Sequence, residues 1–359
     1  MKRRTQLQIK QLAVITIAWL LTGCLITVYD HLVLHTSNAR GPAADYSFGL
    51  ALGFNLGSAF IGAALGGSLL VFYVNVKYVD KPYGYTIAVV AVSYILVIMI
   101  IILILGAVSI PLKTGRPLFD PVSGTAFRAF LLDSSRIKNT MIWSIVVAVT
   151  QLLLQISSKF GQGVFGNIIR GKYNTPREEN RIFMFLDMNN STTIAEQLGN
   201  EKYHDLLKDF FADITNPIIE NKGEIYQYVG DEVIVAWKYE DGIRNNQCVQ
   251  CFYDIKRQIE KQKEKYLRQY ELVPSFKAGI HYGNVVAGEV GIIKRDITYS
   301  GDVLNTTSRI MNMCKEFKAE IISSADLVAR MGLVNLNVRP LGSIKLKGKG
   351  QELLLSALG

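Results

Sequence analysis

Four stretches of the sequence are apolar for long enough to cross a lipid bilayer, and they constrain the fold more than any other feature. They run from Leu12 to Leu34, Phe48 to Val76, Tyr85 to Ile110 and Met141 to Ser157. A transmembrane helix needs about 20 apolar residues. The stretches lack the alternation of barrel strands, and only helices and closed barrels satisfy their backbone in lipid. The sequence therefore predicts an N-terminal domain of four transmembrane α-helices over residues 1–157.

The distribution of charge separates this domain from the rest of the chain. Residues 1–177 carry 16 Lys and Arg against 5 Asp and Glu, whereas residues 178–359 carry 23 and 25. The net charge of +9 therefore belongs to the apolar half, where basic residues flank the spans. A nucleic-acid partner would need a basic face on a folded domain. The expected partner is a lipid bilayer, and no nucleic acid.

Basic residues near the ends of the spans predict the orientation of the chain. The basic residues before the first span, between the second and third spans and after the fourth span predict that both termini lie on the cytoplasmic side of the inner (plasma) membrane. These residues are Lys2, Arg3, Arg4, Lys10, Lys77, Lys81, Lys159, Arg170 and Lys172. An even number of spans brings all of them to one side. The connection between the third and fourth spans is also basic and would face outward.

Three features of the membrane half allow more than one interpretation. Glycines spaced along the second span (Gly49, Gly53, Gly57, Gly62 and Gly66) favour close helix packing, either inside one bundle or in a dimer. The run Leu21 to Cys24 resembles a lipoprotein cleavage site, but apolar sequence continues beyond it, as in an uncleaved span. His31 and His35 lie one helical turn apart and suit either a metal or haem site or a plain interfacial position.

A soluble domain follows a cytoplasmic linker of residues 158–180. From residue 181 to 359 the pattern mixes short apolar strands with amphipathic helices. We expect a strand over 181–187, a hairpin around Gly230 and Asp231, a strand–turn–strand over 276–291 and a helix near 302–316. Cys248 and Cys251 form a lone CxxC, which predicts reduced thiols and not a zinc site.

Two acidic residues of this domain stand at strand ends. Asp187 closes the first strand, and Asp231 lies in the turn of the hairpin that follows. If these strands are neighbours in one sheet, both carboxylates emerge at the same edge. Such a pair can hold divalent metals beside a triphosphate, because Mg²⁺ prefers oxygen ligands. The alternative is that each aspartate only stabilises a turn.

Five motifs in chain order then identify a family. FLDMNNSTT, YQYVGDEVIVAW, AGIHYGNVVAGEVG, YSGDVLNTTSR and LKGKG together resemble the catalytic domain of class III nucleotidyl cyclases, the adenylate and guanylate cyclases. The resemblance covers roughly Arg181 to Leu358, about half of the chain. It implies an α+β fold with a ferredoxin-like, palm-type sheet.

The resemblance also implies roles for single residues. Asp187 and Asp231 match the family's metal-binding aspartates, with the Met188 carbonyl as a further ligand and two Mg²⁺ or Mn²⁺ ions per site. Asn305 and Arg309 match the catalytic residues that orient the ribose and stabilise charge on the α-phosphate.

The remaining implied residues bind substrate. Lys347 matches the lysine that grips the terminal phosphates, and Thr192 belongs to the phosphate loop. Gln227 and Thr298 fall where the family reads the purine. The site is shared between two chains in this family, so the resemblance implies a homodimer with composite sites.

The implied reaction converts ATP into 3′,5′-cyclic AMP and pyrophosphate. The chain departs from the family at Asn190 and Ser191, where Gly-Phe is usual, and at Gln227, where adenylate cyclases usually have a lysine. An amide both donates and accepts, so Gln227 leaves GTP open. Thr298 and the absence of the glutamate typical of guanylate cyclases favour ATP.

Two other functions remain as alternatives. Val229-Gly230-Asp231-Glu232 echoes the motif of diguanylate cyclases, which have a second glycine where Val229 stands. A catalytically inactive nucleotide-binding signalling module is the alternative from another class. His281, flanked by glycines, is expected to be structural.

Overall fold

The computed structural model describes residues 3–36, 47–74, 77, 81–160, 164–293, 295–332, 336–346, 350 and 352–359. The chain divides into two compact units, one made mainly of residues 5–159 and one made mainly of residues 160–359. Each unit is described by itself below.

The first unit is helical. Its elements are α1 (Arg3–Thr36), α2 (Phe48–Gly62), η1 (Ala63–Gly67), η2 (Leu69–Val74), α4 (Tyr83–Thr114), α5 (Pro121–Leu131) and α6 (Ser134–Phe160). Among the described residues, four helical stretches are long and apolar enough to cross a membrane: Arg3–Leu34, Phe48–Val74, Gly84–Thr114 and Ile137–Lys159. The predicted N-terminal region of four apolar helices is thereby confirmed.

Helix α5 was not expected from the sequence, which suggested only a basic connection. Asp120 caps its first turn by accepting a hydrogen bond from the amide of Val122, and Pro121 suits the first helical position. The helix packs against α4 at Gly106, where an added Cβ would lie 2.6 Å from Phe127. The small residue therefore makes room for the aromatic face of α5.

Two of the glycines of the second span pack inside the bundle. After α2 this span continues through the π-helical turns η1 and η2. An added Cβ at Gly62 would contact the ring of Trp19 at 3.4 Å, and one at Gly66 would lie 2.7 Å from the Tyr94 hydroxyl. These two positions fit the interpretation as contacts within one bundle, whereas Gly53 has nothing within 4 Å.

The other two ambiguous features lie on α1. The helix runs unbroken through Cys24, which is a free thiol. The ring of His31 packs edge-on against Phe48. The side chain of His35 lies outside the described residues.

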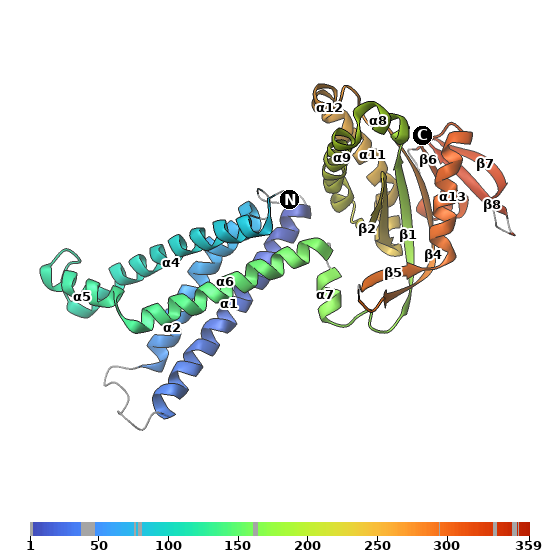
Figure 1. Ribbon diagram of the computed structural model, residues 1–359. Helices are drawn as coiled ribbons and strands as arrows, with labels where there is room; N and C mark the ends of the chain where they lie inside the picture. The colour runs from blue at the N-terminus through green and yellow to red at the C-terminus, as the bar shows by residue number, and fades with distance from the viewer. Residues whose placement is uncertain are drawn as a thin grey trace. The chain divides into compact units, whose positions relative to one another are not determined.

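The second unit is built around one mixed sheet (Figure 1). Its strands are β1 (Arg177–Met188), β2 (Glu224–Val229), β3 (Glu232–Lys238), β4 (Phe276–Val290), β5 (Asp296–Ser300), β6 (Ile321–Ser324), β7 (Val338–Lys345) and β8 (Glu352–Leu358). Their order is β2-β3-β1-β4-β6-β8-β7, with β5 paired to β4. All pairs are antiparallel except β4 with β6.

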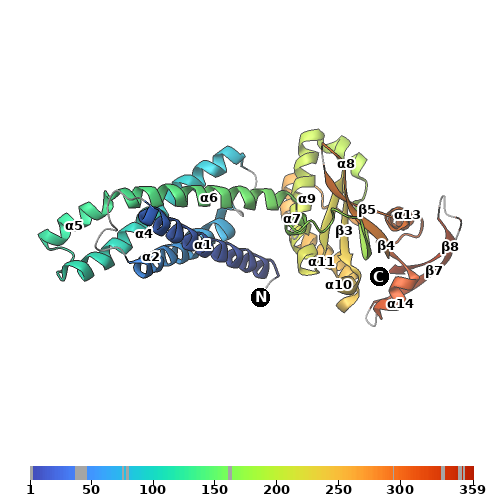
Figure 2. The same ribbon diagram turned by 90° about the horizontal axis from the view of Figure 1, so that it is seen from below.

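Helices cover both faces of this sheet. The helices of this unit are α7 (Val164–Ile169), α8 (Ser191–Leu198), α9 (Asn200–Glu220), α10 (Tyr239–Ile243), η3 (Arg244–Asn246), α11 (Gln247–Lys261), α12 (Lys263–Tyr270), α13 (Asp302–Glu316) and α14 (Ala325–Met331). Figures 1 and 2 show α9 and α11 on one side of the strands and α13 on the other. The alternation along β1 explains the two cores, because Met184 packs with the α9 and α11 residues while Phe183 packs with Met311 of α13.

The predicted turn within residues 276–291 is wrong, because β4 is one continuous strand. Its glycines serve a different purpose. An added Cβ at Gly279 would lie 2.4 Å from the backbone nitrogen of Met311, and one at Gly283 would lie 2.7 Å from Val303. Both glycines therefore allow α13 to pack directly on the strand.

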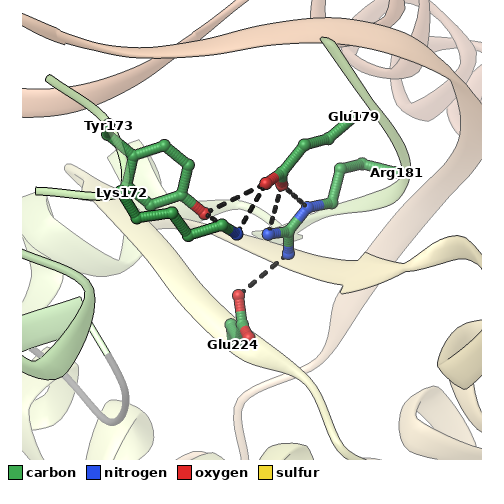
Figure 3. Close-up of polar contacts among 5 residues, drawn as sticks. All are labelled: Lys172, Tyr173, Glu179, Arg181 and Glu224. Atoms are coloured by element: carbon green, nitrogen blue, oxygen red, sulfur yellow. Dashed lines mark hydrogen bonds and ion pairs between the residues drawn. The ribbon is translucent and has the colours of Figure 1, made fainter. Parts of the chain in front are cut away.

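A buried ionic cluster ties the segment before β1 to the sheet (Figure 3). Arg181 is only 2% exposed and donates hydrogen bonds to Glu179 and Glu224 at 2.8 and 2.9 Å. Lys172 donates to Glu179 at 2.7 Å, beside Tyr173. Burial alone would raise the pKa of Glu179, but the hydrogen bonds from the two cations lower it. The cluster therefore fixes the start of β1, the strand that carries Asp187 near its other end.

Candidate active site

Asp187 lies at the end of the central strand with a charged neighbour on each side. In the ladders, Asp187 is opposite Glu232 of β3 and opposite Lys277 of β4. The ammonium of Lys277 donates a hydrogen bond to the Asp187 carboxylate. Both side chains are about one-fifth exposed, at 21% for Asp187 and 20% for Lys277. A carboxylate is thus held at the sheet edge in a partly dry position.

Asp231 occupies the turn that joins β2 to β3. Gly230 takes a φ of +62° immediately before it, a conformation that favours glycine in a two-residue hairpin turn. Because β3 is the neighbour of β1, the turn lies at the same edge of the sheet as Asp187. This is the arrangement that the sequence predicted for the two acids.

The electrostatics of the edge show that the carboxyls crowd one another. Burial raises the pKa of Asp187; Lys277 opposes this rise, and the charge and hydrogen bonding of Asp231 add to it. Burial, together with the charges of Asp187 and Asp231, raises the pKa of Glu232 to about 7. Asp187 and Asp231 therefore repel each other and Glu232 in the space at this end of the strands, where the Lys277 ammonium pairs with Asp187.

Such a space fits a divalent cation. Carboxylate oxygens are the donors that Mg²⁺ and Mn²⁺ prefer, and a cation would relieve the repulsion that raises these pKa values. Among the described residues no group of three or more His, Cys, Asp or Glu is arranged to hold a metal. A cation held by Asp187 and Asp231 would therefore take further oxygen ligands from the backbone, water or phosphate.

Asn305 and Arg309 lie one turn apart on α13. The helix is seated on β4 at Gly279 and Gly283, so the position of its side chains is set by the central sheet. Asn305 is exposed and Arg309 is half-buried. In the part of the chain that is described, the Arg309 guanidinium makes no ion pair. It is available to an anion.

The substrate-binding residues expected from the sequence are dispersed over the unit. Gln227 is exposed on β2, beside a bulge in its pairing with β3. Thr298 is half-buried on β5, opposite Gly288. Thr192 is exposed at the start of α8. Met188 is the buried last residue of β1, and Lys347 lies outside the described residues.

The described residues of this set do not form a single contact network within one chain. The side chains that interact with Asp187 and Asp231 include Lys277, Glu232 and Tyr203. No hydrogen bond or ion pair between described residues links the two acids to Asn305 or Arg309. Between the described residues, the acidic edge and these two α13 side chains therefore share no polar contact.

Comparison with known proteins identifies the family of the segment that forms this sheet. Residues 174–355, half of the chain, match the family described as the adenylate and guanylate cyclase catalytic domain. This chain belongs to that family. The match begins just before β1 and ends within β8, and the recognition made from the five motifs is confirmed.

Relatives and a solved structure agree with this assignment. Adenylate cyclase 2 of Rhizobium meliloti is 34% identical over 207 residues, which cover 57% of this chain and 57% of that protein. Adenylate cyclase of Anabaena cylindrica is 27% identical over 178 residues, covering 47% of this chain and 35% of that protein. The chain thus spans about half or less of these relatives.

A bacterial light-regulated adenylyl cyclase has a similar structure, with a TM-score of 0.54 and 20% sequence identity. The similarity covers 64% of this chain and 67% of that one. At this identity it shows the fold, so the expected α+β cyclase fold is confirmed.

The cyclase domain contains site residues that the sequence reasoning missed. Lys277 reads as an ordinary strand lysine, and only its register opposite Asp187 reveals it. Glu232 follows Asp231 directly, and its raised pKa depends on burial that no motif signals. Both residues could have been identified from their positions near the ends of the two strands that pair with the strand of Asp187.

His281 is half-buried, whereas Cys248 and Cys251 lie in the core between the sheet and its helices. His281 shares a hydrogen bond of 2.9 Å between its Nδ1 and the Ser324 hydroxyl. Cys248 and Cys251 are free, fully buried thiols, and burial raises the pKa of Cys248 to about 12.

Proposed function

We propose that the protein is a membrane-anchored adenylate cyclase, a phosphorus–oxygen lyase that converts ATP into 3′,5′-cyclic AMP and pyrophosphate. The observation that carries the proposal is the pair of acids at one sheet edge, Asp187 and Asp231, inside a domain of the cyclase family. The two relatives described above are both named adenylate cyclases.

In the reaction the ribose 3′-oxygen forms a bond to the α-phosphorus, and the bond from that phosphorus to the leaving pyrophosphate breaks. Asp187 and Asp231, with the Met188 carbonyl, would hold two Mg²⁺ or Mn²⁺ ions. When bound, these ions lower the pKa of the attacking hydroxyl and neutralise phosphate charge. The protein's own contribution is positioning and electrostatic stabilisation.

Basic side chains complete the proposed site. Arg309 would stabilise charge on the α-phosphate, because its planar guanidinium stays charged and presents paired donors. Asn305 would orient the ribose. Lys347 and Thr192 would bind the terminal phosphates. When Asp187 binds a metal ion in place of Lys277, the Lys277 ammonium would face the same phosphates.

The two halves of the site would meet between two chains. Asp187 and Asp231 of one chain would face Asn305, Arg309, Gln227 and Thr298 of its partner, giving a homodimer with two composite sites. The lack of a polar contact between the acidic edge and the two α13 side chains, among the described residues of one chain, supports this arrangement. The membrane helices would anchor the enzyme in the inner membrane with both termini in the cytoplasm.

The experiment that tests the proposal identifies the product. The purified full chain in lipid nanodiscs is incubated with ATP or GTP and with Mg²⁺ or Mn²⁺, and the product is separated by chromatography. We expect 3′,5′-cyclic AMP from ATP. Cyclic GMP from GTP would instead support the guanylate cyclase alternative, which Gln227 leaves open. Cyclic di-GMP would contradict membership of this reaction class, and no product would favour an inactive nucleotide-binding module.

A further inference from the structure

The helical unit contains a cavity that the cyclase reaction does not use. Its volume is about 520 Å³, within the range of small-molecule sites. It lies between α1, α2, α4 and α6, and its walls include Trp19, Gly62, Tyr94, Val97, Ile101 and Val147. Its lining residues on α1 extend from Trp19 to Leu34, about 22 Å at 1.5 Å per residue, compared with about 30 Å for a bilayer core.

The deep part of the cavity is apolar and aromatic. Trp19 is 2% exposed, and its ring contacts those of Tyr94 and Trp143 at centroid distances of 6.0 and 5.8 Å. The indole nitrogen of Trp19 is already satisfied by the Thr150 hydroxyl at 3.0 Å. The Tyr94 hydroxyl is buried here without a hydrogen-bond partner among the described residues, but the surrounding rings and aliphatic side chains suit the hydrocarbon part of a ligand.

The opposite end of the cavity is charged. It is lined where α1 ends and α6 begins by Asp30, Lys138 and Asp133, and by Lys113 near the end of α4. Lys138 and Asp30 form an ion pair at 2.5 Å and so neutralise each other. Asp133 has an interaction of its own. Among the described residues Lys113 makes no ion pair, so the mouth offers one cation to a ligand.

We propose that this cavity binds a single-chain amphiphile, with its hydrocarbon chain between the helices and an anionic head at Lys113. Because one end of the cavity is apolar and the other is charged, the cavity favours a ligand with a hydrocarbon chain and a polar head. The unpaired Lys113 ammonium favours a negatively charged head. The proposal concerns the helical unit alone and does not depend on the cyclase activity.

Tryptophan fluorescence gives a direct test, because two of the three tryptophans line the cavity. The third, Trp237, is fully buried in the cyclase domain. The full chain in phosphatidylcholine nanodiscs is titrated with a chain-brominated long-chain carboxylate, since bromine quenches tryptophan on contact. We expect saturable quenching at a concentration about tenfold lower than for the methyl ester of the same chain, a difference of about 1.4 kcal/mol.

Matched variants locate the binding site. Ala51→Phe fills the cavity wall and should remove the saturable quenching, whereas Ala64→Phe, at an exposed position outside the cavity, should retain it. Ser58→Phe gives a second wall variant in case the first loses helix content by circular dichroism. Lys113→Gln should abolish the preference for the carboxylate, and Lys81→Gln, which is exposed and does not line the cavity, should preserve it.

Three results would overturn the proposal. The first is quenching that does not saturate or that persists in both wall variants. The second is equal quenching by the carboxylate and its ester. The third is quenching by brominated phosphatidylcholine in the nanodisc alone that equals the saturating quenching by the carboxylate, which would show that bilayer chains occupy the cavity.

Discussion

The ammonium of Lys277 is hydrogen-bonded to the carboxylate of Asp187, its register partner across the β1–β4 ladder. A lysine of the neighbouring strand thus forms an ion pair with the carboxylate that we propose as a metal ligand. It partly offsets the burial that raises the pKa of Asp187. Lys277 and a divalent cation would therefore compete for the same oxygens before nucleotide binds.

Lys277→Met is expected to change metal and nucleotide binding in opposite directions. Removing the competing cation should strengthen Mn²⁺ binding several-fold, because a nearby like charge disfavours a bound cation. The same change should raise the KM for nucleotide, since a phosphate contact is lost. Calorimetric Mn²⁺ titration without nucleotide and steady-state kinetics measure the two effects. Lys263→Met, whose exposed lysine pairs with Glu260 three residues earlier in the chain, serves as the control. Weaker Mn²⁺ binding in Lys277→Met would contradict the competition.

The stability of the metal-free protein should fall between pH 4.5 and about 7. The pKa of Glu232 is raised from 4.5 to about 7 by burial and by Asp187 and Asp231, so the folded state holds this proton more tightly than the unfolded chain. The stabilisation is complete below pH 4.5 and lost as the pH rises through 7. Glu232→Gln should flatten this dependence by less than about 3.4 kcal/mol, the limit set by 1.36 kcal/mol per pH unit, because the side chain is only half-buried and solvent screens part of the interaction. Chemical unfolding at pH 5 and pH 8 measures it, and an unchanged slope in the variant would refute this origin.

Gly279→Ala should destabilise the cyclase domain. The added methyl group would lie 2.4 Å from the Met311 backbone nitrogen, so α13 must move away from β4. Overpacking of this kind costs about 1–3 kcal/mol or more. Gly288→Ala on the same strand is the matched control, because its Cβ would make ordinary contact with Pro176 at 3.4 Å. Thermal unfolding measures both, and equal melting temperatures would show that the contact does not hold the helix.

The sequence predicted those parts of the fold that depend on local pattern. Apolar length alone revealed the four spans, and the Gly230–Asp231 turn revealed the β2–β3 hairpin. It failed where a residue's role depends on a distant partner. A turn was predicted within residues 276–291, but Gly283 in that segment lies in a continuous strand, and its small size serves the packing of Val303. The contribution of Lys277 depends on register across two strands that are 90 residues apart in sequence, which no local motif encodes.

Complementation tests whether the site is shared between chains. Asp231→Ala and Arg309→Ala should each be inactive alone, because each removes one half of both sites. Coexpressed, they should recover about one quarter of wild-type activity, since half of the randomly mixed C2 dimers carry one intact site of two. Differently tagged chains and sequential affinity purification establish that mixed dimers form. Purified mixed dimers without activity would exclude composite sites.

The central claim is that Asp187 and Asp231 together hold the cations that nucleotide cyclisation needs. The most direct measurement is cyclic AMP formation from ATP across a Mn²⁺ titration, for the wild type, Asp187→Asn, Asp231→Asn and the control Asp241→Asn. Asp241 is paired with Lys222, and the hydrogen bond from that lysine lowers its pKa. We predict at least about a hundredfold loss of activity in the two site variants at every Mn²⁺ concentration, with unchanged melting temperature, and near wild-type activity in the control. Substantial cyclic AMP formation by either Asp187→Asn or Asp231→Asn would contradict the account.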